Sequence, residues 1–566
     1  MHDVVIRGGT LVDGTGAAAR PADLGIDGSK VVEVGDVVAR GRREVDAAGL
    51  LVLPGWVDVH THYDGQATWD AELAPSSWHG VTTTIFGNCS VGFAPVRPGH
   101  EGFLINLMEG VEDIPGSALA EGIDFRWESF GEYLDALDET SRAMDIGAQL
   151  PHAALRFYVM GDRGADHAEV PTSEEIAAMG DLAIEAIRAG AFGFTTSRTK
   201  KHRAADGRFT PSLTAHRAEL LGIAEALGSA GIGVLQINSD FGTDEEIDLV
   251  RDMAEVSGRP LSFSLIQLDD RPDQWRELLH MVGDVNGNGG HMLAQVGSRP
   301  IGVLFGFAAT LHPFMTHPGW GELAPLPLDE RLHKLAEPDV RAQLLSQRPD
   351  ESFGRFLTTA MQRTFELGDP PEYEPEPSQS IAARAERAGV DPFTMAYDLM
   401  LAKGGEALLY HPFENYSHGS LDPVREMIVS PHTIAGLSDG GAHVGTICDG
   451  SFPTYLLTHW ARDRTRGERI PVEQLVHRQT QATAEAVGLH DRGVLAPGYR
   501  ADINLVDFDA LRIHPPELAF DLPGGSRRLL QRCTGYRHTF LAGAETFVDG
   551  EWTGATPGKL VRSGWA

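Results

Sequence analysis

Between residues 55 and 445, short apolar runs typical of buried strands alternate with longer stretches of helical periodicity. One helical stretch, 173–189, opens with the capping-box pattern of Thr172 and Glu175. Such alternation predicts parallel strands joined by helical crossovers. The strand-like runs are 56–62, 81–87, 145–150, 191–197, 233–237, 261–267, 291–296 and 434–439. Eight units of this kind predict an α/β fold, a (β/α)8 barrel whose active site lies at the C-terminal ends of its strands.

The two ends of the chain have a different pattern. Residues 1–54 and 490–566 both read as short strands separated by tight Gly-containing turns. We therefore expect a small β-sandwich domain formed by both termini and a TIM-like barrel at 55–489. Between the seventh and eighth strands, the segment 310–430 is too long for a simple loop. We expect it to form an insertion, a lid or subdomain over the barrel mouth.

Composition excludes several classes of function. The 566-residue chain has a formal net charge of −33, which argues against nucleic acid or an anionic membrane as a partner, since both require a basic protein surface. Three cysteines are too few for a disulfide framework, and the N-terminus has no signal-peptide pattern, so we expect a cytoplasmic protein. The expected partner is a small molecule, and a homo-oligomer is compatible with the sequence.

The first strand-like run ends in two histidines, His60 and His62. Residues i and i+2 of a strand point to the same face, so both imidazoles converge on one point. Neutral imidazole is a common ligand of zinc and related metals. Two histidines on a solvated edge strand are the structural alternative. The apolar strand, the Pro54-Gly55 break before it and the acidic and aromatic residues after it favour a metal site.

Two further residues follow strand ends. Cys89 comes after the second strand; a buried free cysteine is usually only a small hydrophobe, but beside a metal its thiolate is a suitable ligand. Asp439 ends the eighth strand, where a carboxylate can take a proton from metal-activated water and return it to the leaving group. The alternative for Asp439 is a turn or a helix cap.

Four stretches of the chain resemble the amidohydrolase superfamily, and within it the N-acyl-D-amino-acid deacylase (D-aminoacylase) family. They are PGWVDVHTHYDGQATWD, HGVTTTIFGNCSVGFAP, GLSDGGAH and RGVLAPGYRADINLVD. The resemblance covers nearly the whole chain. It implies a metal-dependent barrel hydrolase, with a β-sandwich built from both termini, that cleaves the amide of N-acyl-D-amino acids. By this resemblance His60, His62 and Cys89 match metal ligands, and Asp439 matches the catalytic aspartate.

The resemblance is incomplete at two strand ends. The family has a metal histidine after its fifth strand, in a run like S-H-x-K, where this chain has Asn238 and Ser239. The sixth-strand histidine is also missing from 261–267. The sequence therefore predicts one Zn²⁺ ion rather than two. Its expected ligands are His60, His62, Cys89 and Asp439. The family's carboxylate-binding H-P-R run after the catalytic aspartate is absent, which leaves specificity for D-amino acids open.

Three residues are candidates for contact with substrate. His152 and Arg156, in the run PHAALR after the third strand, match a family H-x-x-L-R pattern. Arg156 would serve equally well as the partner of a buried carboxylate. His443, four residues after Asp439, is expected to contact substrate or to support a metal ligand, with a surface histidine as the alternative.

The predicted function is metal-dependent hydrolysis of a linear C–N amide bond, with an N-acyl-(D-)amino acid as the expected substrate and Asp439 as general base and acid. Two alternatives remain. One is a cyclic amidohydrolase of the hydantoinase or dihydroorotase type, against which the Cys89 stretch argues. The other is a catalytically silent homologue that acts as a binding or scaffold protein, which the two missing histidines suggest.

Overall fold

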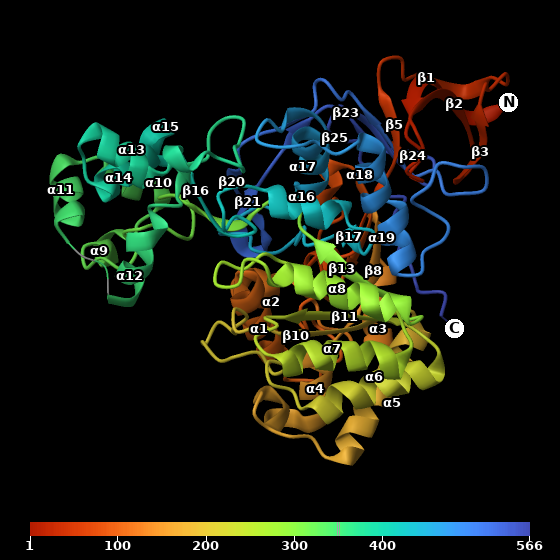
Figure 1. Ribbon diagram of the computed structural model, residues 1–566, viewed down its shortest axis with the longest axis horizontal. Helices are drawn as coiled ribbons and strands as arrows, with labels where there is room; N and C mark the ends of the chain where they lie inside the picture. Colours follow the sequence, from red (N-terminus) through yellow and green to blue (C-terminus); the bar gives the residue numbers. More distant parts are fainter. Residues whose placement is uncertain (348, 350, 566) are drawn as a thin grey trace.

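The computed structural model describes residues 1–347, 349 and 351–565. Its centre is a ring of parallel strands, most of which helices hide in Figure 1. The strands of the ring are β6 (Trp56–Asp58), β7 (Val81–Phe86), β8 (Asp145–Ala148) with β9 (Leu150–Pro151), β10 (Gly193–Arg198), β11 (Val234–Ser239), β12 (Leu261–Ser264), β13 (Met292–Val296) and β17 (Thr433–Ala435). They pair in two runs, β6-β7-β8 and β9-β10-β11-β12-β13-β17. The predicted α/β class and the predicted order of the strands are confirmed.

Two seams join these runs. At one seam a single residue, Gln149, separates β8 from β9, and its amide donates to the Phe86 carbonyl at 2.9 Å. At the other, Thr61 bridges to Gly440 in parallel, and the Asp439 amide donates to the His60 carbonyl at 3.1 Å. The ring is therefore closed, and its second seam holds the first and last strand ends side by side.

Helices surround this ring. Within the described residues they are α1 (Glu101–Glu112), α2 (Gly116–Gly122), α3 (Phe130–Asp138), α4 (His152–Met160), α5 (Ser173–Ala189), α6 (Arg217–Ala230), α7 (Asp244–Ser257), α8 (Gln274–Gly287), α16 (Asp422–Val429), α17 (Phe452–Tyr455), a π-helix (Leu456–Asp463), α18 (Val472–Gln479) and α19 (Gln481–Ala486). The predicted capping box starts α5: the Thr172 side chain accepts from the Glu175 amide, and the Glu175 side chain accepts from the Thr172 amide. None of the helices in the described part of the chain combines the length and apolarity that a bilayer crossing needs.

Both ends of the chain contribute to one nine-stranded sheet of the described residues. Its strands are β1 (His2–Leu11), β2 (Arg20–Asp27), β3 (Lys30–Gly35), β4 (Gly41–Asp46), β5 (Leu51–Pro54), β18 (Ile503–Val506), β23 (Tyr536–Leu541), β24 (Ala544–Val548) and β25 (Glu551–Trp552). The sheet folds back on itself, because Lys30 bridges to Arg500 and the Val31 amide donates to the Tyr499 carbonyl. This folded sheet encloses its own apolar core, in which Leu24 packs with Phe540.

Gly55 is the single residue between β5 of this sheet and β6, the first strand of the barrel. A Cβ at Gly55 would lie 2.2 Å from the Thr82 hydroxyl of β7, so only glycine allows the chain to pass from β5 directly into β6. The Pro54-Gly55 break that marks the sequence therefore coincides with the change of sheet.

The long segment between β13 and β17 forms a lobe that projects from the body in Figure 1. Its elements are β14 (Ile301–Phe305), α9 (Trp320–Leu323), α10 (Leu328–Leu335), α11 (Pro338–Ser346), α12 (Glu351–Ala360), β15 (Phe365–Glu366), α13 (Ile381–Ala388), α14 (Pro392–Met400), α15 (Ala402–Gly405) and β16 (Leu409–Glu414). The lobe has its own apolar core, built around Phe307, Phe314 and Tyr397. The segment thus leaves the barrel at β14, before the expected start at residue 310.

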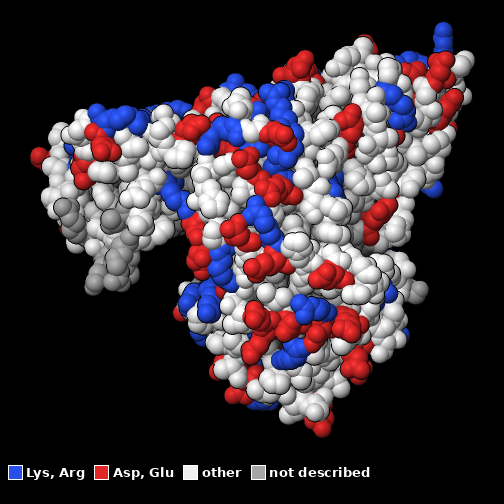
Figure 2. Space-filling model, in the orientation of Figure 1, with Lys and Arg blue, Asp and Glu red and all other residues white. Residues whose placement is uncertain are grey.

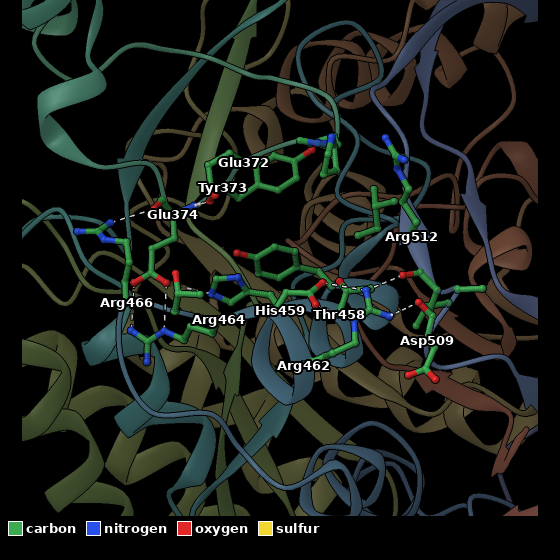
Figure 3. Close-up of a pocket in the computed structure, with 18 residues that line it drawn as sticks. Glu372, Tyr373, Glu374, Thr458, His459, Arg462, Arg464, Arg466, Asp509 and Arg512 are labelled. Atoms are coloured by element: carbon green, nitrogen blue, oxygen red, sulfur yellow. Dashed lines mark hydrogen bonds and ion pairs between the residues drawn. The ribbon is translucent and has the colours of Figure 1, made fainter. Parts of the chain in front are cut away.

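A buried ion network attaches the base of the lobe to the body (Figure 3). The Glu374 carboxylate accepts two hydrogen bonds of 3.0 Å from Arg464, and its Oε2 lies 3.0 Å from His459 Nε2. Arg466 donates to the Glu374 carbonyl from the same side. These groups border a cavity of 370 Å³ in which each arginine already has an acidic or carbonyl partner.

Charged side chains of both signs are scattered over the face shown in Figure 2, where Lys and Arg lie among Asp and Glu on a mostly uncharged surface.

Candidate active site

Three predicted metal ligands meet at the C-terminal ends of β6 and β7. The ligand atoms of His60, His62 and Cys89 all lie within 4.8 Å of one another, and all three side chains are buried. His60 Nε2 is 3.4 Å from Cys89 Sγ. Cys89 adopts a φ of 55°, which turns the chain sharply after β7 and directs the thiol toward the histidines. The structure thus brings together residues that are 29 positions apart in the sequence.

Asp439 joins this group across the second seam of the barrel. Its Oδ1 lies 3.5 Å from His60 Nε2 and 3.7 Å from His62 Nε2. Ligand bonds of about 2.0 Å to nitrogen or oxygen and 2.3 Å to sulfur give tetrahedral edges of about 3.3–3.5 Å. The observed separations are close to those edges. Moreover, His62 Nε2 and Asp439 Oδ1 are buried and have no hydrogen-bond partner among the described residues. The donor set and its unpaired atoms fit a zinc ion.

Neighbouring polar groups hold the ligands in place. The Gln295 carbonyl oxygen accepts from His60 Nδ1 at 2.6 Å, which leaves Nε2 free to bind a metal. Glu112 Oε1 lies 3.3 Å from His62 Nδ1. Asn238 donates from its amide to Cys89 Sγ at 2.8 Å. None of these three roles was predicted. For Gln295 the signal was available, since it is at the C-terminal end of the seventh strand.

Burial controls the protonation of the ligands. It lowers the pKa of His60 and brings that of His62 to about 4, so both rings are neutral and able to bind a metal at neutral pH. Burial would raise the pKa of Asp439, but the neighbouring imidazoles of His62 and His60 hold it well below its usual value. For the Cys89 thiol, burial raises the pKa well above the usual value, and the Glu112 and Asp439 carboxylates raise it further.

A cavity of about 220 Å³ opens over these ligands. One wall is apolar and consists of Val111, Phe241, Ile266, Leu268, Leu278, Ile301, Phe413 and Leu437. The polar side includes His202, His443 and the ion pair between Lys201 and Glu414. From the lobe, only β14 and β16 with their flanking residues contribute to the described lining, through Ile301, Phe413 and Glu414. No described residue of the lobe's helices lines the cavity.

The fifth and sixth barrel strands, β11 and β12, carry no histidine in the described structure. Asn238 on β11 and Ser264 on β12 occupy the ends of these strands, and the Ser264 hydroxyl donates to the Asn238 carbonyl oxygen. Because Asn238 also donates to Cys89, both the oxygen and the nitrogen of its side-chain amide are hydrogen-bonded. Amide and hydroxyl groups are weak zinc ligands compared with imidazole and thiolate.

Of the three residues predicted to contact substrate, the structure places one at the cavity and two elsewhere. His443 lines the cavity, with Nε2 3.9 Å from Asp439 Oδ2. His152 and Arg156 are absent from the described lining and are fully buried on α4. There His152 Nε2 lies 3.1 Å from Glu219 Oε1, and Arg156 donates to both Glu219 oxygens. Arg156 thus pairs with a buried carboxylate, which was the alternative role considered from the sequence.

We expect Glu219→Ala to lower the free energy of unfolding by about 3–5 kcal/mol, because it leaves the buried Arg156 charge without its carboxylate partner. Denaturant titration measures the loss, and Glu225→Ala, at an exposed site on the same helix, is the matched control. The amount of metal bound per folded chain should not change. A loss of metal from folded Glu219→Ala protein would contradict a purely structural role.

Comparison with known proteins agrees with this geometry. A family model described as the amidohydrolase family matches residues 43–550. D-aminoacylase of Alcaligenes xylosoxydans xylosoxydans is 27% identical over 575 residues, covering 99% of this chain and 97% of that protein. N-acyl-D-aspartate deacylase of the same organism is 28% identical over 572 residues, covering 99% and 95%.

Similarity extends to the fold. A structure of D-aminoacylase, solved in work on the role of that protein's binuclear metal centre, has a TM-score of 0.65 at 23% identity, and the match covers 99% of this chain and 100% of that one. The family model itself spans most of the sequence, from the terminal sheet through the barrel to the C-terminal strands. The chain therefore belongs to the amidohydrolase family.

Proposed function

We propose that this protein is a zinc-dependent hydrolase that removes the acyl group from N-acyl-D-amino acids. The observation that carries the proposal is the convergence of His60, His62, Cys89 and Asp439 beneath one cavity. Relatives that match almost the whole chain are named D-aminoacylase and N-acyl-D-aspartate deacylase, which supports this substrate class.

The four converging residues would hold a single zinc ion. When bound there, zinc supplies a Lewis acid that polarises the amide carbonyl and a positive charge that makes water acidic enough to react at neutral pH. One ion is proposed because Asn238 and Ser264 occupy the strand ends opposite His60 and His62, and they bind each other. This chain would thus differ from that D-aminoacylase, which has a binuclear metal centre.

Asp439 is proposed to move the proton. Its Oδ1 faces His60 and His62, whereas Oδ2 points toward His443 and is the oxygen available to accept a proton from the attacking water. The low pKa keeps the carboxylate ionised before the reaction, as a general base requires. The same oxygen would then deliver the proton to the leaving nitrogen, so that the amine departs neutral.

The cavity walls are proposed to position the substrate. The apolar wall of Phe241, Ile266 and Phe413 suits an acyl chain or an apolar amino-acid side chain. His443, one-third exposed at the cavity, is placed to contact the polar end of the substrate. His152 and Arg156 would act only by holding α4 against α6 through Glu219.

Elemental analysis of purified protein, combined with a substrate panel, tests the proposal. We expect one zinc per chain and turnover of N-acetyl-D-amino acids, with loss of both after chelation and recovery on adding back one equivalent. N-acetyl-L-amino acids and hydantoins complete the panel. Ring opening of hydantoins alone would identify a cyclic amidohydrolase. Absence of metal and of turnover would instead favour a silent binding protein.

A further inference from the structure

Glu112 is a buried acidic residue with no role in the proton transfer proposed for Asp439. It is the last residue of α1, its side chain is 1% exposed, and it lines the cavity beside the metal ligands. Burying a carboxylate costs several kcal/mol unless a partner compensates for the lost hydration. A group near Glu112 is therefore needed to compensate for the hydration that its carboxyl group loses.

The partner that the structure offers is His62. Glu112 Oε1 is 3.3 Å from His62 Nδ1, and neither atom has a hydrogen-bond partner among the described residues. His62 Nε2, on the opposite side of the ring, points to Asp439. A proton on Nδ1 that is donated to Glu112 leaves the Nε2 lone pair for a metal, so one contact sets both the tautomer and the ring orientation.

His60 provides an internal comparison. Its Nδ1 is bound by the Gln295 carbonyl oxygen at 2.6 Å, and its Nε2 also faces Asp439. In both histidines a side-chain oxygen therefore lies near Nδ1, at 2.6 Å for His60 and at 3.3 Å for His62. They differ in the group that supplies this oxygen, which is the side-chain amide of Gln295 for His60 and the carboxyl group of Glu112 for His62.

The end of α1 also contacts the loop that carries Asp439. The His443 amide donates to the Glu112 carbonyl, and the Gly445 amide donates to Asp113 Oδ2 at 3.2 Å. Glu112 Oε2 lies 3.7 Å from His443 Nε2. The C-terminal end of α1 therefore contacts His62 on one side and the Asp439 loop on the other.

We propose that Glu112 is a positioning residue of the metal centre, which orients His62 for zinc binding by accepting the Nδ1 proton. This role rests on the proposed function, since it presupposes that the centre binds zinc. Gln295 has the equivalent role for His60. Glu112 itself is not a ligand in this proposal: it is on the far side of the His62 ring from Asp439 Oδ1.

Zinc affinity and the visible spectrum of the Co²⁺-substituted protein test the role without relying on turnover. Glu112→Ala should weaken zinc binding about 10–100-fold, as losses of groups that support metal ligands do. It should also change the cobalt bands, because the His62 ring is no longer fixed. Glu112→Gln retains an oxygen acceptor at the same place and should restore the spectrum and bring the affinity within a few-fold of wild type.

Glu185→Ala, at an exposed site on α5, serves as the control and should match wild type in both measurements. Wild-type affinity and spectrum in Glu112→Ala would overturn the proposal. So would a loss in Glu112→Gln as large as that in Glu112→Ala, which would make Glu112 a ligand instead. A wild-type protein that binds no zinc would refute the proposed function itself, an outcome distinct from both.

Discussion

Asp439→Asn should reduce kcat by about 10³–10⁴-fold, the upper part of the range that a positioned proton-transfer group contributes. Asparagine has the same shape, but it cannot accept the proton of the attacking water or return it to the leaving amine. The change also removes one negative charge from the metal site. Steady-state kinetics on an N-acetyl-D-amino acid measures the loss, and the zinc content of each sample is determined in parallel.

Asp181→Asn, on the exposed side of α5, is the matched control for this change and should keep wild-type kinetics. Circular dichroism establishes that both variants are folded. A kcat for zinc-loaded Asp439→Asn within about tenfold of wild type would contradict the assigned role, because a general base is worth more than that. In that case another group at the cavity, with His443 the nearest, would have to carry the proton.

Cys89→Ser should lower zinc affinity by more than about 100-fold, beyond what changes to groups outside the ligand set cause. A serine hydroxyl is a far weaker zinc ligand than a thiolate. Because burial and the nearby carboxylates raise the pKa of Cys89, the thiol is protonated in the metal-free protein at pH 7. Zinc binding should therefore release a proton from wild type, and affinity should rise with pH.

Calorimetry in buffers of different ionisation enthalpy counts the released proton, which should be missing from Cys89→Ser. Cys448→Ser is the control, since Cys448 is also buried but does not line the cavity. Full zinc occupancy of Cys89→Ser at low micromolar free zinc, with one proton still released, would show that the thiol is not a ligand.

The strands were predictable because buried parallel strands leave a strong apolar signal. The residues at which the strands end were not predictable. The predicted strand 434–439 extends beyond β17, which ends at Ala435. Residues 436–439 instead form an irregular segment that presents Asp439. The convergence of His60, Cys89 and Asp439 followed from the same signal. Parallel strands in a closed ring bring their C-terminal ends together, however far apart these are in the sequence.

The supporting contacts were not predictable from local spacing. His152 and Arg156 fit a functional pattern, but their environment is decided by Glu219, which reaches them from a different helix. Glu112 likewise gains its role only because the end of α1 packs against the residues that follow β17. Such contacts depend on how elements pack, and an amphipathic helix pattern does not specify which distant side chain it meets.

The sheet shared by both termini has a consequence for how the protein is made. On one edge β5 pairs with β1, but its other edge pairs with β18, which the ribosome synthesises only near the end of the chain. At about 5–20 residues per second, the intervening residues take roughly 20–90 s to appear. Throughout that time the apolar strand Leu51–Pro54 has an open edge, the type of surface on which nascent chains aggregate. Completion of the last strands is therefore what protects the first ones from self-association.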